Sequence, residues 1–124
     1  MLKTSLLLLT MATVSLSTTP SNTTAVEFTT DNSLYISENI KQICAITADN
    51  MKDIQYSIIG GKDKNQFNID QKTGKLSFIH TPNYESPLDS DLNNKYEVIV
   101  AINRDMEIVN RKQFTITVLD MIEL

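Results

Sequence analysis

The stretch FNIDQKTGKLSF, residues 67–78, decides the fold. Apolar and polar residues alternate in its first four and last four positions, which suits strands because successive side chains of a strand point to opposite faces. The segment QKTGK follows the first alternating run, and its Gly74 suits a turn position with positive φ. The stretch therefore predicts two short strands joined by a turn. The side chains expected to face the core are Phe67, Ile69, Leu76 and Phe78.

The same two-residue period continues on both sides of this stretch. Short alternating runs are separated by turn-forming Gly, Pro, Asn and Asp, and such spacing is typical of antiparallel β-sheet proteins. One buried and one solvated face per strand explains the alternation. We predict an all-β fold, a seven-stranded antiparallel Greek-key β-sandwich of the immunoglobulin-like kind. The remaining strands are expected within residues 34–40, 43–48, 54–60, 96–103 and 113–120.

Length and composition limit the function. The chain has 124 residues, enough for one domain, and 41% of them are hydrophobic, enough for a core. Trp is absent, so the core must be mainly aliphatic. The net charge is −4 and no basic stripe occurs, so we expect no nucleic-acid partner. Grouped Asp and Glu fit a divalent cation or simple solubility.

The N-terminal residues 1–17 have the layout of a secretory signal peptide. Lys3 precedes an apolar run, and small residues follow it, as in exported proteins. The run is shorter than the roughly 20 apolar residues that span a bilayer, although a retained N-terminal anchor is the alternative. We therefore expect a secreted or cell-surface protein.

The next segment, residues 18–33, is rich in Thr, Ser and Asn. This composition predicts a flexible lead with little to bury, although Val26–Phe28 could pair as a short extra strand. A single domain is then expected over residues 34–124.

Residues that could carry catalysis are few. The single cysteine, Cys44, cannot form an internal disulfide and is in phase with core residues, so we expect a buried, unreactive thiol. The single histidine, His80, has no serine motif near it, and the metal- and phosphate-binding motifs of enzymes do not occur. A glycosidase would need a cleft around two carboxylates, for which a small sandwich has little room. We expect no enzyme activity.

With these strands in place, the order of motifs resembles a cadherin repeat, most closely the cadherin-like repeats of large bacterial surface proteins. The resemblance covers residues 36–123. Its most specific part is FNIDxxTGKLSF, followed at the right distance by PNYE and then YEVxVA. It implies the cadherin-like form of the sandwich and a role in adhesion or protein interaction.

The resemblance also implies a calcium site. In cadherins, calcium lies between successive repeats and stiffens the array. Glu38, Glu85 and Asp120 stand where the family has acidic ligands, and Glu123 stands where the linker motif often has a second acid. These acids should converge at the C-terminal end of the sandwich. Asp49 matches the first acid of the family's aspartate pair, which belongs to the opposite end.

The chain departs from the family pattern at several ligand positions. Met51 replaces the second acid of the aspartate pair, and Asn103 replaces the acid after the V-x-A strand. Ile122 replaces the usual linker Asn, and Asn83 stands where Asp is frequent. A partial carboxylate set predicts weak calcium binding, at or beyond the range of roughly 10⁻⁴ to 10⁻³ M usual for extracellular modules.

A second acidic segment, DSDLNN, follows Glu85 at residues 89–94. It fails as an EF-hand loop, because its sixth position is not Gly and no helices flank it. We expect a polar turn in which Asp and Asn satisfy backbone donors locally, with an ancillary cation contact as the alternative. The residues concerned are Asp89, Asp91, Asn93 and Asn94.

The predicted function is that of an exported module for calcium-dependent adhesion or protein interaction at the cell surface, by self-association or with another protein. Two alternatives remain open. One is a secreted module that binds polysaccharide or matrix through Tyr35 and Tyr84, its plausible exposed aromatics. The other is a relic repeat of a longer adhesin. Retention on a glycan column would favour the first alternative, and the absence of any binding would favour the second.

Overall fold

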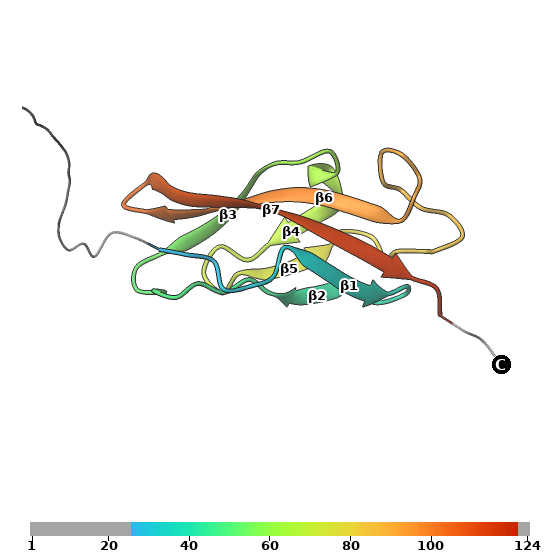
Figure 1. Cartoon of the computed structure of the whole chain (residues 1–124), viewed down its shortest axis with the longest axis horizontal. Helices are drawn as coiled ribbons and strands as arrows, with labels where there is room; N and C mark the ends of the chain where they lie inside the picture. The colour runs from blue at the N-terminus through green and yellow to red at the C-terminus, as the bar shows by residue number, and fades with distance from the viewer. Residues whose placement is uncertain (1–25, 122–124) are drawn as a thin grey trace, which may run out of the picture.

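The computed structural model describes residues 26–121, which form two β-sheets packed face to face (Figure 1). The predicted β-sandwich is confirmed, and each predicted strand overlaps an observed one. The strands are β1 (Ser33–Ser37), β2 (Gln42–Ala45), β3 (Gln55–Gly60), β4 (Phe67–Ile69), β5 (Lys75–Phe78), β6 (Lys95–Arg104) and β7 (Glu107–Leu119), with a short 3₁₀ helix, η1 (Lys64–Gln66), before β4.

Strands β1, β7, β6 and β3 form the larger sheet in this order. β6 and β7 make a long hairpin whose turn residues, Asp105 and Met106, have φ values of 53° and 67°. Two successive residues with positive φ are typical of the turn whose twist matches that of paired strands. Because the turn is so tight, β7 begins at Glu107 instead of near residue 113 as predicted.

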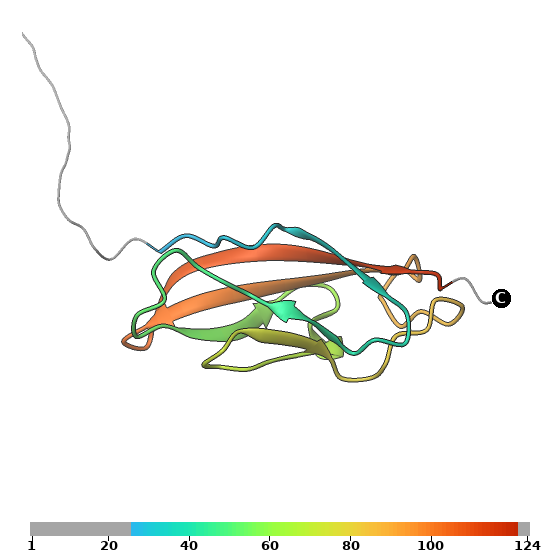
Figure 2. The same ribbon diagram turned by 90° about the horizontal axis from the view of Figure 1, so that it is seen from below.

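The expectation of an entirely antiparallel sandwich is wrong for one strand pair. β1 runs parallel to β7, with Ser37 opposite Leu119, whereas the other paired strands are antiparallel. Figure 1 and Figure 2 show β1 alongside β7. The chain leaves β1 for the other sheet, so no tight hairpin forces the pair to be antiparallel. As a result, β1 and β7 end at the same edge.

The smaller sheet contains β2, β5 and β4 in this order, and its β4–β5 turn is the predicted one. Oδ1 of Asp70 accepts hydrogen bonds from the N–H groups of Lys72 (2.8 Å) and Thr73 (2.9 Å). Gly74 has φ of 75°, and a Cβ there would lie 2.5 Å from the carbonyl oxygen of Ile46. Glycine is therefore required both by the backbone conformation and by the close approach of the neighbouring chain.

The inner faces of the sheets enclose one hydrophobic core. Every second residue of β6 from Tyr96 to Ile102 is at most 2% exposed, as the alternation predicts. The rings of Phe67, Phe78 and Tyr96 pack together, with centroids 4.9 to 6.0 Å apart. Cys44 packs against this core but is only half-buried, and its partial burial raises the pKa of the thiol.

Residues 26–33, expected to belong to a flexible lead, pack against the sandwich instead. Val26 is 2% exposed, and Phe28 forms a β-bridge with Ala48. The ring of Phe28 also meets Phe114 edge-on, with centroids 5.7 Å apart. This is the short pairing left open for Val26–Phe28. Val26 is buried and Phe28 partly buried against the core, and removal of apolar surface from water stabilises this packing although the neighbouring residues are polar.

Residues 26–33 therefore pack with the sandwich that was predicted to begin at residue 34. The predicted signal peptide, residues 1–17, and the first part of the lead, residues 18–25, lie outside the described residues, so both remain predictions. Within residues 26–121, no helix is long and apolar enough to cross a membrane.

Candidate functional site

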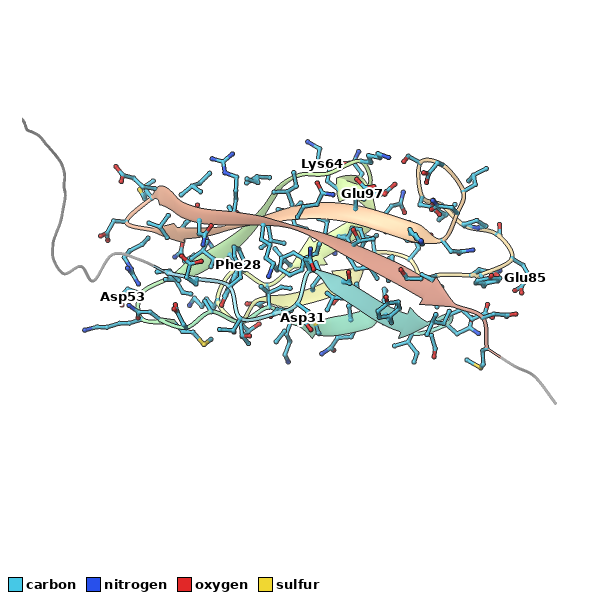
Figure 3. The ribbon with its side chains drawn as sticks, viewed as in Figure 1. Phe28, Asp31, Asp53, Lys64, Glu85 and Glu97 are labelled. Atoms are coloured by element: carbon cyan, nitrogen blue, oxygen red, sulfur yellow. The ribbon has the colours of Figure 1, made fainter. Side chains whose placement is uncertain are left out.

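Three carboxylates from distant parts of the sequence meet at one end of the sandwich. Glu38 follows β1, Glu85 lies in the β5–β6 connection, and Asp120 follows β7. One oxygen from each lies within 4.8 Å of the other two. Figure 3 shows Glu85 at the end of the domain where β7 terminates, far from Asp53 at the other end. We call this group, three of the five acids selected from the sequence, the carboxylate cluster.

The parallel pairing of β1 with β7 places two of these acids side by side. Ser37 lies opposite Leu119, and the next residue on each strand is an acid. The N–H of Glu38 donates to the carbonyl of Leu119 (3.0 Å), and the N–H of Met121 donates to Oε2 of Glu38 (2.9 Å). These bonds hold the end of β7 against the end of β1.

The third acid is brought in by the β5–β6 connection. The N–H of Tyr84 donates to Oε1 of Glu38 (3.1 Å). The side chain of Asn83 accepts from the N–H of Glu85 (3.0 Å), a local turn typical of Asn. Each oxygen of Glu38 thus accepts a backbone hydrogen bond from a different segment, and Glu38 links all three parts of the cluster.

The charges of the cluster act on one another. Glu38 is 5% exposed, and hydrogen bonds from the N–H groups of Met121 and Tyr84 lower the pKa of its carboxyl group. Loss of solvent, followed by the negative charge of Glu38, raises the pKa of the Glu85 carboxyl. Hydrogen bonds favour the ionised form, whereas like charges oppose it. A cation between the carboxylates would relieve this repulsion.

The donors and spacing of the cluster fit a calcium ion. Ca²⁺ binds carboxylate oxygens at about 2.3–2.6 Å, so two ligands of one ion lie at most roughly 5 Å apart. The 4.8 Å limit of the cluster meets this condition. Ca²⁺ takes about six to eight oxygens, so additional ligands are needed if each carboxylate supplies one oxygen.

Of the other two selected acids, Asp49 lies apart from the cluster. Asp49 lies in the β2–β3 connection with Asp53, which Figure 3 places at the opposite end. Oδ1 of Asp49 accepts from the N–H of Glu27 (2.9 Å). Glu123 lies outside the described residues. The Asp53 end also has an open hollow of about 490 Å³, lined by Asp53, Ile54, Gln55, Lys72, Asn103, Asp105 and Met106.

The acidic segment after Glu85 folds as the predicted polar turn. Asp89 is 2% exposed, and its carboxylate accepts hydrogen bonds from the N–H groups of Asn93 (2.8 Å) and Asn94 (3.0 Å). Asp89 is therefore a buried acceptor for its own loop, not a solvated charge.

Asp63 was missed by the sequence analysis. It is 5% exposed and accepts hydrogen bonds from the N–H groups of Ser90 (2.7 Å) and Glu97 (2.8 Å). These bonds tie the β5–β6 connection and β6 itself to the segment before η1. Asp63 lies outside any alternating run, so no periodic signal marks it as buried.

Comparisons with solved structures identify the fold as that of cadherin extracellular domains. Drosophila N-cadherin EC1-3 matches with a TM-score of 0.64 and 22% identity, over 86% of this chain and 36% of that chain. Human protocadherin-24 EC1-2 matches with a TM-score of 0.62 and 17% identity, over 77% of this chain and 45% of that chain. The predicted cadherin-like fold is therefore confirmed.

Comparisons of sequence match a much smaller part of the chain than the comparisons of structure. No family model matches the chain. Halomucin from Haloquadratum walsbyi is 43% identical over 37 residues, which are 30% of this chain and 0%, after rounding, of halomucin. The chain thus spans a very small part of this relative and less than half of the two cadherin chains. The likeness to bacterial repeats in particular remains a prediction.

Proposed function

We propose that this chain is an extracellular cadherin-like interaction module that binds calcium through Glu38, Glu85 and Asp120. The observation that carries the proposal is the meeting of these three acids within 4.8 Å. They were selected as calcium ligands from the sequence, and they come from three separate segments. Asp49, which lies apart from this cluster, and Glu123 are retained as further candidate ligands.

The chain's own contacts suggest what the ion would do. Calcium supplies positive charge that offsets the repulsion among the three carboxylates. Glu38 already joins the ends of β1 and β7 through Met121 and holds the Glu85 loop through Tyr84. Binding would attach the Glu85 and Asp120 side chains to the same ion. The ion would therefore stiffen the segment that leaves the sandwich after β7.

The incomplete ligand set links calcium to association. One oxygen from each of the three carboxylates supplies only part of the roughly six to eight oxygens that Ca²⁺ takes, so oxygens from a second domain, a second copy or another protein would complete the shell. Binding of calcium and of the partner would then strengthen each other. The proposed role is binding without catalysis, in a protein exported by its N-terminal segment.

The test is thermal unfolding of residues 18–124 in EDTA and in calcium up to about 10 mM. A ligand stabilises by RT ln(1 + [L]/Kd), so a site with a Kd of about 1 mM would add about 1.4 kcal/mol at the highest concentration. We expect a rise of several degrees in Tm that magnesium does not reproduce. The double variant Glu38→Gln/Glu85→Gln should abolish it.

Asp91→Asn is the matched control for charge. Asp91 is exposed and its carboxylate accepts only from the side chain of Asn93 among the described hydrogen bonds. This variant removes one acid from the same loop and should keep the calcium response. A calcium series that leaves the Tm of the unaltered protein unchanged would reject the proposal.

Carbohydrate binding is the second candidate, because two tyrosines are exposed. Tyr35 is 66% and Tyr84 38% exposed, and such rings could stack on sugars. Retention on a glycan column that is lost in Tyr35→Ala and Tyr84→Ala would favour this function. Calcium-dependent self-association in sedimentation measurements would favour adhesion instead.

A further inference from the structure

The β5–β6 connection that carries Glu85 is held by Asn94, the residue before β6. The N–H of Asn94 donates to Oδ1 of Asp89 (3.0 Å), and its carbonyl accepts from the N–H of Val118 in β7 (2.9 Å). Its side-chain Nδ2 donates to the carbonyl of Tyr84 (3.0 Å). Asn94 therefore connects both ends of the loop to the strand that leads to Asp120.

The hydrogen bond from Asn94 to Tyr84 helps to position a member of the carboxylate cluster. The carbonyl of Tyr84 belongs to the peptide that precedes Glu85, so Nδ2 of Asn94 holds the backbone from which the Glu85 side chain projects. The N–H of the same Tyr84 donates to Glu38. One residue is thus held from one side by Asn94 and from the other by a member of the cluster.

Two features of Asn94 work against local stability. Its φ is 65°, a left-handed conformation that glycine adopts at less cost. Its side-chain Oδ1 is buried without a hydrogen-bond partner among the described residues, and a buried unsatisfied acceptor is destabilising. A glycine would suit the backbone and bury no unpaired acceptor. The contact that glycine would lose is the hydrogen bond from Nδ2 to Tyr84.

We infer that Asn94 is the positioning residue of the calcium site, acting through the Tyr84–Glu85 peptide to bring the Glu85 carboxylate to Glu38 and Asp120. This inference rests on the proposed function. In this proposal Asn94 does not bind the ion. Its side chain fixes the peptide before Glu85, and Glu85 binds the ion.

The test compares Asn94→Gly with unaltered residues 18–124 by calcium calorimetry and by thermal unfolding in EDTA. Residues that orient metal ligands typically change metal affinity about 10- to 100-fold when replaced, so we expect calcium binding at least tenfold weaker. The Tm in EDTA should change little, since glycine keeps the backbone conformation. Asn93→Ala is the control, because the Asn93 side chain forms hydrogen bonds only with Asp91 and Lys95 among the described residues. The Asn93→Ala protein should bind calcium with unchanged affinity.

A double-mutant cycle separates positioning from general stabilisation. If Asn94 acts through Glu85, then Asn94→Gly should cause little further loss of affinity in a Glu85→Gln background, since coupled residues are not additive. Fully additive losses, an unchanged affinity, or loss of the fold in EDTA would each overturn the inference. An unaltered protein that binds no calcium would instead overturn the proposed function.

Discussion

The carboxylate of Glu38 accepts a hydrogen bond from the N–H of Met121, 2.9 Å away and 83 residues later in the chain. This bond joins the end of the first strand to the residue beyond the last. The other oxygen of Glu38 accepts from Tyr84. A single buried acid thus serves the fold and the proposed site together, and its replacement should affect both.

Glu38→Gln should lower the Tm in EDTA and weaken calcium binding at least tenfold. A glutamine side chain has one acceptor oxygen, so its NH₂ group would face one of the two backbone donors and leave that donor unpaired. Thermal unfolding in EDTA and calorimetry measure the two effects separately. An unchanged Tm would show that the hydrogen bonds to Met121 and Tyr84 contribute little to stability.

Glu85→Gln should have opposite effects without and with calcium. In EDTA at pH 7 it should raise the Tm, because it removes a carboxylate whose pKa is raised by lost solvent and by the charge of Glu38. In calcium the variant should gain less stability than the unaltered protein. The two Tm curves should therefore cross as calcium increases, and curves that stay parallel would exclude Glu85 from the site.

Asp70→Asn should change the pH dependence of stability. Hydrogen bonds from the N–H groups of Thr73 and Lys72 lower the pKa of the Asp70 carboxyl in the folded protein. Its stabilisation is therefore present above the unfolded pKa, near 3.9, and is lost as pH falls through the lower folded value. Urea unfolding should show that the variant loses more free energy of unfolding, relative to the unaltered protein, at pH 7 than near pH 2. An equal loss at the two pH values would contradict the lowered pKa of the Asp70 carboxyl.

Gly61→Ala should be far more destabilising than Gly60→Ala. Gly61 has φ of 105°, and a Cβ there would lie 2.5 Å from the carbonyl oxygen of Glu97, so we expect a loss above about 2 kcal/mol. At Gly60 the nearest atom, Cδ1 of Ile99, is 3.4 Å away, so we expect a change in stability of less than about 1 kcal/mol. Urea unfolding gives both values, and similar losses would refute the difference.

A chain that begins at residue 34 should be less stable than one that begins at residue 26. It would lack Val26, which is 2% exposed, and burial of such a side chain stabilises by about 1.5–3 kcal/mol. It would also lack the carbonyl of Val26, to which Nδ2 of Asn110 donates (2.7 Å). Equal urea midpoints for the two chains would mean that residues 26–33 contribute nothing to the domain.

Local patterns predicted the strands well and their boundaries less well. The alternation along β6 and the DQKTG turn depend on neighbouring residues, so the sequence reveals them. The start of β7 was missed because the short Asp105–Met106 turn lies among polar residues that carry no clear period. The packing of Val26 and Phe28 was left open because the residues around them are polar and give no period, although Val26 is buried and Phe28 is partly buried.

By itself, the sequence determined the β-sandwich, its cadherin-like pattern and the acids worth testing, because strand periodicity and motif spacing are local properties of the chain. Only the tertiary structure decided that β1 runs parallel to β7 and that Glu38, Glu85 and Asp120 meet while Asp49 lies apart. It also decided that Asp63 and Asn94 hold the loop. These relationships depend on which distant backbone donors face each side chain, and that is set only when the two sheets pack together.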